Sequence, residues 1–161
     1  MTAPLIVGLQ GLELSARERD FLETVRPLGI IVFARNVDTR DQLKGLVAAA
    51  LDASGASLAF VDQEGGRVQR LKPPLAPRYP AARVIGATYE RDNAAGLRAA
   101  WLAGRLIGAD LAPYGLNVPC LPVADVPIPG AHDVIGDRAY GTTPEAVTFL
   151  AGAAAEGVLA A

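Results

Sequence analysis

The stretch LAFVDQEGGRVQR, residues 58–70, changes abruptly from an apolar run to acids, glycines and arginines. The run 58–61 is typical of a buried strand, and the two glycines after Glu64 let the backbone turn with positive φ and let a ligand approach closely. Carboxylates accept hydrogen bonds, whereas the guanidinium groups of Arg67 and Arg70 donate them in fixed forks. The stretch therefore predicts a buried strand that ends at a ligand-binding site.

Strands and helices are expected to alternate on both sides of this stretch. The run LGIIVFA, residues 28–34, is continuously apolar, which is typical of a strand covered on both faces. Ser15 and Glu18 have the spacing of a capping box, so a helix is expected to start there. The expected strands lie near residues 5–8, 28–34, 57–61 and 116–126, and the expected helices near residues 16–25, 40–54, 93–111 and 146–161. This alternation predicts a parallel sheet with right-handed crossovers.

Two long segments are expected to be loops. Prolines recur between Pro73 and Pro80 and exclude a helix or a central strand there, so residues 64–90 are expected to form an ordered loop with a short helical turn near Ala82. Residues 127–141 form the second expected loop. Long loops inside a compact domain usually carry function.

The alternating pattern fits two α/β folds of a single domain spanning residues 1–161, namely a doubly wound open sheet and a (β/α)8 barrel. Polar residues follow the expected strands at 35–36, 62–70 and 125–138, and both folds bind ligands at the carboxyl ends of their strands. No Gly-x-Gly-x-x-Gly follows the first strand and no P-loop motif is present, which weakens the nucleotide-binding, doubly wound alternative.

The composition narrows the classes of partner. A net charge of −2 gives no electrostatic reason to expect nucleic acid or an anionic membrane as a partner. The N-terminus lacks the pattern of a signal peptide, and no run approaches the roughly 18 apolar residues of a membrane helix, so a cytoplasmic protein is predicted. Cys120 is the only cysteine and is expected to be a small buried side chain. His132, the only histidine, is expected in a solvated loop, and no metal or other cofactor is predicted.

Four motifs occur in order across most of the chain: IVFARN (31–36), VDQEGGRVQR (61–70), LPVADV (121–126) and VIGDRAY (134–140). Together they resemble the N-terminal half of the catalytic domain of glycoside hydrolase family 3, and specifically its bacterial β-N-acetylhexosaminidases of cell-wall recycling. The ten-residue block around Asp62 is the most specific of the four.

The resemblance implies a fold, an activity and three binding residues. The fold is a TIM-type (β/α)8 barrel, of which this chain covers about the first four β/α units. The activity is hydrolysis of terminal β-linked N-acetylglucosamine from muropeptide-type saccharides, with retention of configuration through a double displacement. By the same resemblance, Asp62 binds sugar hydroxyls, Arg70 helps to hold that end of the pocket, and Arg138 reaches the sugar from the loop after the fourth strand.

The chain departs from the family pattern in one respect. Family members carry a Lys-His-x-Pro-Gly-His-Gly segment, with the general acid/base histidine, after the fourth helix, and a nucleophilic aspartate later still. Neither segment occurs in residues 1–161, whereas a complete barrel needs roughly 250 residues. No catalytic residue is therefore expected in this chain, and the chain alone is predicted to be inactive.

Asp62 and Glu64 are not expected to be the two catalytic carboxylates of a retaining glycosidase. Such carboxylates lie ~5 Å apart across the sugar, and the resemblance assigns Asp62 to binding instead. Glu64 is expected to accept hydrogen bonds from loop N–H groups or from an arginine.

Three further charged residues are expected to support the binding residues. Arg67 is expected to form a loop-bracing ion pair, with ligand contact as the alternative, because arginine readily forks onto carboxylates. Asp137 is expected to brace Arg138, and Asp125 to brace the rim of the site or to contact the sugar.

Two alternatives to this hydrolase remain open. Four parallel strands leave two exposed edges, which favours a non-catalytic half-barrel that acts as a binding or assembly module and self-associates through those edges. A family member that cleaves a different β-glycoside also fits, because the residues that recognise the acetamido group are expected downstream. For the hydrolase itself, the predicted partner is an N-acetylglucosamine-containing saccharide.

Overall fold

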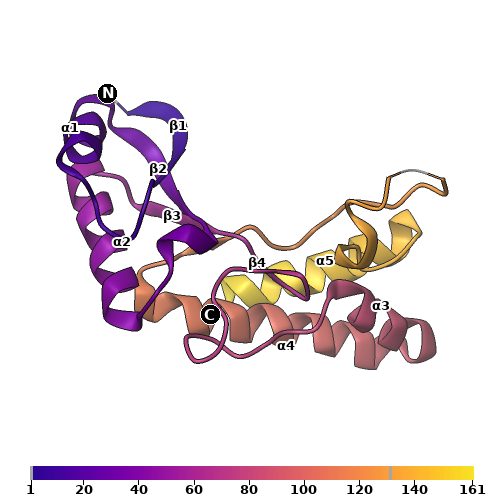
Figure 1. The fold of residues 1–161 in the computed structure, drawn as a ribbon. Helices are drawn as coiled ribbons and strands as arrows, with labels where there is room; N and C mark the ends of the chain where they lie inside the picture. Colours follow the sequence, from indigo (N-terminus) through magenta and orange to yellow (C-terminus); the bar gives the residue numbers. More distant parts are fainter. Residues whose placement is uncertain (1, 131) are drawn as a thin grey trace. The chain divides into compact units, whose positions relative to one another are not determined.

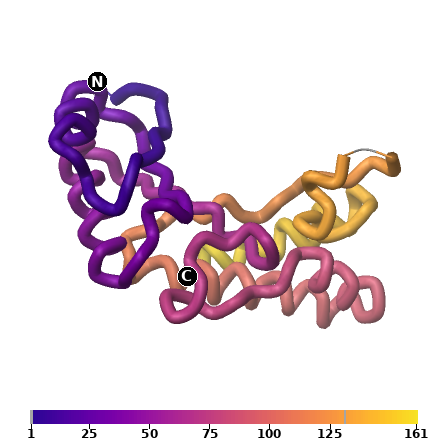
Figure 2. Tube along the Cα trace, in the orientation of Figure 1, coloured from indigo at the N-terminus to yellow at the C-terminus, as the bar shows by residue number. Residues whose placement is uncertain are grey.

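The structure, a computed structural model, describes residues 2–130 and 132–161. Figure 1 labels the helices and strands, and Figure 2 follows the chain by colour from the N-terminus to the C-terminus. The chain divides into two compact units, each assembled from two separate segments. Residues 1–62 and 111–119 form the sheet unit, and residues 63–110 and 120–161 form the helical unit.

The sheet unit contains a four-stranded sheet in the order β1-β2-β3-β6. Its strands are β1 (Ala3–Gly8), β2 (Pro27–Val32), β3 (Leu58–Val61) and β6 (Val118–Pro119). All three pairings are parallel, with Ile30 opposite Ala59 and Phe60 opposite Val118. The parallel pairing confirms the prediction from the alternating apolar runs.

Two helices connect the first three strands (Figure 1), namely α1 (Ala16–Val25) and α2 (Arg40–Ser54). The Ser15 hydroxyl accepts the N–H of Glu18 at 3.2 Å while the Glu18 carboxylate accepts the N–H of Ser15 at 3.1 Å, which confirms the capping box. Gly55 ends α2 in the left-handed conformation, with φ 65°. The fully or almost fully buried side chains of β2 and α2 include Ile30, Val32, Leu43, Leu46, Val47 and Ala50. Burying each of the larger ones contributes about 1.5–3 kcal/mol.

Short 3-10 turns occur at two places in the sheet unit. The turn η1 (Ala34–Asn36) begins just after β2, so the expected strand 28–34 stops at Val32. The turn η2 (Ala112–Tyr114) leads towards β6, and Gly115 closes it with φ 75°.

The helical unit starts with an antiparallel hairpin of β4 (Gln63–Gly65) and β5 (Val68–Gln69). Three helices follow, namely α3 (Ala82–Arg91), α4 (Asn93–Leu111) and α5 (Pro144–Leu159). A 3-10 turn, η3 (Gly136–Arg138), interrupts the loop before α5. The predicted bounds of α4 are confirmed. Helix α5 begins at Pro144, two residues before the expected start, and the Thr143 hydroxyl caps it by accepting the N–H of Ala146.

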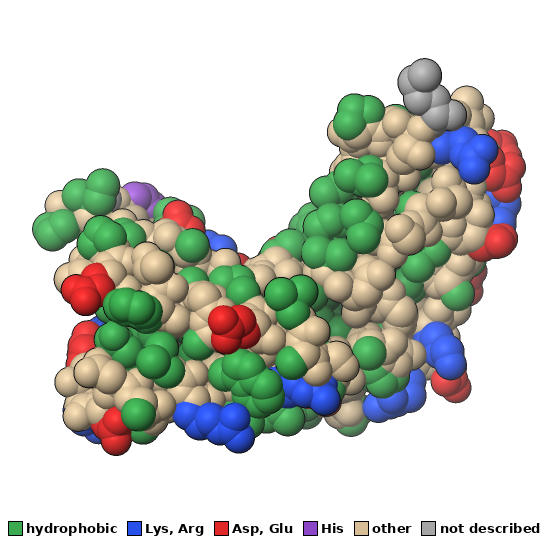
Figure 3. Space-filling view, turned by 180° about the vertical axis from the view of Figure 1, so that it is seen from behind, with side chains coloured by type: hydrophobic (Ala, Val, Ile, Leu, Met, Phe, Trp, Pro, Cys, Tyr) green, Lys and Arg blue, Asp and Glu red, His purple; other side chains and the backbone are tan. Residues whose placement is uncertain are grey.

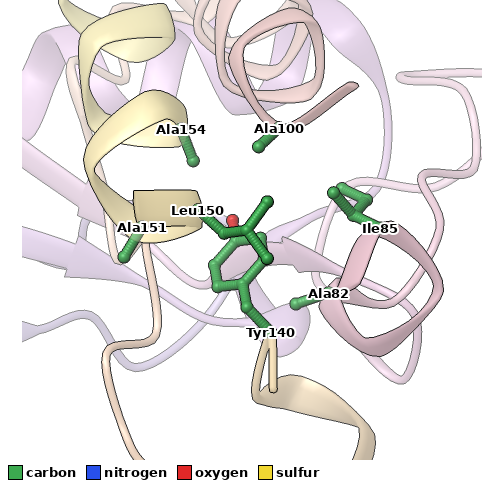
Figure 4. Close-up of a cluster of buried hydrophobic side chains, with 7 residues drawn as sticks. All are labelled: Ala82, Ile85, Ala100, Tyr140, Leu150, Ala151 and Ala154. Atoms are coloured by element: carbon green, nitrogen blue, oxygen red, sulfur yellow. The ribbon is translucent and has the colours of Figure 1, made fainter. Parts of the chain in front are cut away.

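Tyr140 belongs to the buried cluster of the helical unit, and its ring lies between side chains of α3 and α5 (Figure 4). The cluster consists of Ala82, Ile85, Ala100, Tyr140, Leu150, Ala151 and Ala154. Helices α4 and α5 approach each other at glycines: a Cβ atom added at Gly104 would lie 2.1 Å from the carbonyl oxygen of Ala154. The small residues therefore allow the two helix backbones to touch.

The expected loop 64–90 is wrong in its second half. The structure has a hairpin at the start of this segment and a ten-residue helix, α3, where only a short turn was expected near Ala82. Ala81 at the N-cap makes no side-chain hydrogen bond, so the usual start signal is missing. The helix depends instead on Ala82 and Ile85, which are buried in the Tyr140 cluster.

The expected fourth strand, residues 116–126, is also wrong in extent. Only Val118 and Pro119 pair with β3. Pro119 and Pro122 lack the N–H group that a ladder requires, so the pairing stops at the first proline. Cys120, just beyond the strand, is half-buried instead of fully buried.

Candidate functional site

Polar side chains gather at the carboxyl ends of β2 and β3 in the sheet unit. Asn36 is fully buried; its Nδ2 atom donates to the carbonyl oxygens of Leu9 (3.1 Å) and Gly11 (2.8 Å). The Arg35 Nε atom donates to the same Leu9 oxygen at 2.9 Å. These two residues therefore brace the segment after β1. Asp62, the predicted sugar-binding residue, follows β3 directly and is half-buried.

Gln63 organises the hairpin that follows Asp62. Its side chain is fully buried, and its Oε1 atom accepts the N–H groups of Arg70 and Leu71 at 3.0 Å each. Its Nε2 atom donates to the Leu71 carbonyl oxygen at 2.9 Å. Arg70 is thus held by its backbone at the end of β5, with a half-buried side chain.

Gly65 and Gly66 form the turn of this hairpin, with φ of 94° and 57°. A Cβ atom at Gly65 would lie 2.4 Å from the Pro80 carbonyl oxygen, and one at Gly66 would lie 2.7 Å from the Ala81 Cβ. The glycines are needed because residues 79–81 lie against the turn. The neighbour that approaches the two glycines closely is the protein segment 79–81.

Glu64 and Arg138 form a bidentate ion pair between the hairpin and the turn η3. Arg138 Nε donates to Glu64 Oε2 at 2.8 Å, and Arg138 Nη2 donates to Glu64 Oε1 at 2.7 Å. The Glu64 side chain is 7% exposed and that of Arg138 24% exposed, so the pair is largely shielded from water. This contact confirms the expectation that Glu64 accepts from an arginine, and it orients the guanidinium group of a predicted sugar-binding residue.

Arg67 makes the second connection from the hairpin to the same loop. Its Nε atom donates to Asp137 Oδ1 at 2.8 Å, which confirms the expected ion pair. Its Nη2 atom lies 2.7 Å from the Val134 carbonyl oxygen and 3.1 Å from that of Ile135. Asp137, expected to brace Arg138, is instead the partner of Arg67. The two side chains of this pair are about half exposed.

The structure thus brings together four of the seven predicted site residues in the helical unit: Glu64, Arg67, Asp137 and Arg138. Asp125 takes no part in these two ion pairs; it borders a hollow of about 220 Å³ together with His132 and Asp133. Asp125 and His132 are exposed, which confirms the expected solvated position of the histidine.

Two tyrosines of the helical unit have hydroxyl groups with a pKa above the ordinary value of 10.0. Burial is the main cause of the raised pKa of Tyr140, and the negative charge of Glu64 adds to it. Burial and a hydrogen bond to the Asp110 carboxylate raise the pKa of Tyr79. Both hydroxyl groups therefore stay protonated at neutral pH.

Two glutamines of the hairpin escaped prediction from sequence. Gln69 is buried, and its amide joins the Leu71 and Pro77 carbonyl oxygens to the N–H group of Tyr79. Together with Gln63 it satisfies the backbone of the proline-containing segment, which lacks several N–H donors. The signal in the sequence was two amides flanking a Gly-Gly turn, in a run otherwise rich in charge.

No group of three or more His, Cys, Asp or Glu side chains within residues 2–130 and 132–161 is arranged to hold a metal ion. In the same described part of the chain, none of the helices has both the length and the apolar character needed to cross a membrane.

Sequence comparisons relate the chain to known glycosidases. Residues 6–161 match the N-terminal domain of glycosyl hydrolase family 3. A β-hexosaminidase of Alkalilimnicola ehrlichii is 40% identical over 153 residues, which cover 94% of this chain and 43% of that protein. A β-hexosaminidase of Methylococcus capsulatus is 41% identical over 150 residues, covering 93% and 43%. The chain thus spans less than half the length of these relatives.

Solved structures show the same relationship. NagZ from Neisseria gonorrhoeae in complex with N-trifluoroacetyl-D-glucosamine matches with a TM-score of 0.92 at 33% identity, over 99% of this chain and 48% of that chain. A family 3 β-N-acetylglucosaminidase from Paenibacillus matches with a TM-score of 0.84 at 31% identity, over 96% and 29%. These matches confirm the TIM-barrel type of α/β fold, of which the parallel sheet described above forms roughly the N-terminal half. The chain therefore belongs to glycosyl hydrolase family 3, and it corresponds to the N-terminal domain of that family.

Proposed function

We propose that this chain forms the sugar-binding part of a β-N-acetylhexosaminidase that acts on terminal β-linked N-acetylglucosamine. One observation carries the proposal: the chain matches, over 99% of its length, a NagZ structure in complex with N-trifluoroacetyl-D-glucosamine. The β-hexosaminidase relatives support it. Muropeptide-type saccharides are the proposed substrates, with peptidoglycan recycling in the cytoplasm as the proposed setting.

Three residues are proposed to contact the sugar. The Asp62 carboxylate accepts hydrogen bonds from sugar hydroxyls, and the guanidinium groups of Arg70 and Arg138 donate to sugar oxygens. The Glu64 carboxylate, which binds two atoms of the Arg138 fork, keeps that guanidinium group in one orientation. Such residues contribute to the rate by fixing the sugar in place before reaction.

The chemistry itself is proposed to depend on groups outside these 161 residues. A retaining glycosidase uses a nucleophile and a general acid/base in a double displacement through an oxocarbenium-like transition state. Neither role is assigned to a residue of this chain. The chain alone is therefore proposed to bind N-acetylglucosamine weakly and to hydrolyse no glycoside.

A chimera tests this proposal. Residues 1–161 are joined to the remaining part of the Alkalilimnicola ehrlichii β-hexosaminidase, and release of p-nitrophenol from its N-acetylglucosaminide is measured. The chimera is expected to be active and the chain alone inactive. Asp62→Ala in the chimera is expected to lower kcat/KM about 10- to 100-fold, because a charged hydrogen bond to the substrate is lost.

Asp20→Ala, an exposed acid on α1, serves as the matched control and is expected to leave kcat/KM unchanged. Turnover by the chain alone, or full activity of the Asp62 variant, would contradict the proposal. Cleavage of a β-glucoside in preference to the N-acetylglucosaminide would favour the family member of different specificity.

A second candidate function is an assembly module that pairs through its sheet edges. The observation that favours it is the exposure of large apolar side chains on the edge strand β1, Leu5 and Ile6. Figure 3 shows exposed hydrophobic side chains, in green, over the part of the chain that carries this strand. An apolar edge strand is a template for pairing with another chain.

A further inference from the structure

We propose that Arg67 is a positioning residue: it holds residues 133–138 against the hairpin 63–71 and thereby sets the orientation of Arg138. The inference rests on the proposed function only in taking Arg138 as a sugar contact. It gives a role to a side chain that the proposed sugar contacts leave unused.

The starting point is the rigidity of the turn that carries Arg67. Gly65 and Gly66 hold positive φ, and residues 79–81 lie against them so closely that no Cβ atom would fit. The N–H group of Gly66 donates to the Tyr79 carbonyl oxygen at 2.9 Å, which adds a backbone bond to that contact. Arg67 follows directly, so its backbone is fixed before its side chain reaches the loop.

The guanidinium group of Arg67 donates hydrogen bonds to several residues of the loop. Its Nε atom binds Asp137, and its Nη2 atom lies 2.7, 3.1 and 3.4 Å from the carbonyl oxygens of Val134, Ile135 and Asp133. A planar guanidinium group can satisfy these oxygens from two directions, whereas an ammonium group acts as a point charge.

One acceptor links Arg67 directly to the backbone of Arg138. The Ile135 carbonyl oxygen accepts the N–H group of Arg138 at 2.9 Å, which closes the turn η3, and it also accepts from Arg67 Nη2 at 3.1 Å. The side chain of Arg138 is then drawn onto Glu64 in the same hairpin. Hydrogen bonds therefore hold both the backbone and the side chain of Arg138 in place relative to residues 63–71.

Regular structure cannot perform this task. Among the described residues between β6 and α5, the only helical segment is η3, which comprises three residues. Gly136 lies in this turn with φ 45°, so the backbone there is not stabilised by ordinary helical geometry. Side-chain contacts therefore help to fix this loop, and among those that cross to the hairpin the Arg67 fork makes the most hydrogen bonds.

Nuclear magnetic resonance of the ¹⁵N-labelled chain tests the proposal through the Nε–H signal of Arg138 and the backbone amides of residues 137–139. Arg67→Ala is expected to accelerate solvent exchange of these protons about tenfold or more. Without the Arg67 side chain, the loop can open locally without breaking hydrogen bonds to Asp137 and the carbonyl oxygens, so these protons exchange more often. Amides in the middle of α4 are expected to change less than about twofold. Arg78→Ala, an exposed arginine of the same unit, is the matched control and is expected to change neither set.

Arg67→Lys separates the fork from its charge. The proposal expects fast exchange in this variant too, because one ammonium group cannot bind Asp137 and the carbonyl oxygens as the fork does. Unchanged exchange of the Arg138 Nε–H group in Arg67→Ala, or full protection in Arg67→Lys, would overturn the proposal. If Arg67→Ala does not fold, Arg67→Lys alone decides.

A titration with N-acetylglucosamine keeps this test distinct from that of the proposed function. Absence of any sugar-induced shift in the unaltered chain would count against the sugar site but leaves the exchange measurement decisive for Arg67. Where the sugar shifts the Arg138 signal, Arg67→Ala is expected to weaken that binding about tenfold, and unaltered affinity would contradict the positioning role.

Discussion

Glu64 and Arg138 form the better shielded of the two ion pairs that join the hairpin to the loop before α5. Exposed pairs contribute little because water screens them, whereas removal of one partner from a shielded pair leaves a charge without compensation. Because the pair is bidentate and Glu64 is little exposed, it behaves as a shielded pair, and removal of one partner leaves the other charge without compensation. The pair Arg67–Asp137 is half exposed, so it is expected to orient the loop more than to raise the free energy of unfolding.

Glu64→Ala is expected to lower the free energy of unfolding by about 1–3 kcal/mol, because Arg138 loses its shielded partner. The matched control is Glu90→Ala, which removes the exposed partner of Arg83 and is expected to cost less than about 1 kcal/mol. Urea denaturation followed by circular dichroism measures both. Equal losses in the two variants would show that shielding of the Glu64 pair carries no weight.

The raised pKa of Tyr140 predicts a loss of stability in alkali. The folded chain disfavours the phenolate, so this contribution is fully present below the unfolded pKa near 10 and is lost as the pH rises towards the higher folded value. Tyr140→Phe is expected to reduce the slope of stability against pH between pH 9 and 11, by up to about 1.4 kcal/mol per pH unit. Denaturation curves at pH 8, 9, 10 and 11 provide the measurement, and an unchanged slope would contradict the assignment.

At the scale of elements, the contact between α4 and α5 depends on the absence of side chains. Gly104 faces the Ala154 carbonyl oxygen, and Gly157 faces the Trp101 carbonyl oxygen, each closer than any Cβ atom can be placed. Both glycines cost helix propensity. Close backbone contact offsets that cost because the helices bury more of their alanine-rich faces.

Gly104→Ala is expected to destabilise the chain by about 1–3 kcal/mol, since a Cβ atom must push α5 away. Gly152→Ala on α5 is the matched control: nothing lies within 4 Å of its added Cβ atom, so better helix propensity is expected to add up to about 1 kcal/mol. Opposite signs of the two changes in thermal melting would support the packing described here. A stabilising effect of Gly104→Ala would refute it.

At the scale of the whole molecule, the sheet has two edges, β1 and β6. The β6 edge has two residues and ends in Pro119, so it offers few N–H donors for pairing with another chain. The β1 edge is six residues long and carries exposed Leu5 and Ile6. Self-association, proposed as a second candidate function, is therefore expected to use β1.

Multi-angle light scattering of the chain is expected to show an apparent mass that rises with concentration. Ile6→Lys is expected to suppress this rise, because a charged side chain on an edge strand opposes pairing. Phe21→Lys is the matched control, since Phe21 on α1 is exposed to the same 47% as Ile6 but lies on no edge. A mass that stays monomeric at all concentrations would rule out the edge-pairing proposal.

The sequence by itself determined the alternation of strands and helices, the parallel sheet and the family. These features depend on local signals, namely the continuous apolar runs, the Ser15–Glu18 capping box and the Thr143 cap, which act over a few residues. It also predicted that Glu64 accepts from an arginine and that Arg67 forms an ion pair, because carboxylates and guanidinium groups at one strand end have few other partners.

Only the tertiary structure decided which acid meets which arginine. Glu64 pairs with Arg138, and Asp137 with Arg67, although 70 or more residues separate the partners along the chain. The tertiary structure likewise decided that α3 exists without a side-chain cap, because Ile85 is buried beside Tyr140. Local propensity cannot anticipate such contacts, since their free energy comes from burial and charge pairing between segments that the fold alone brings together.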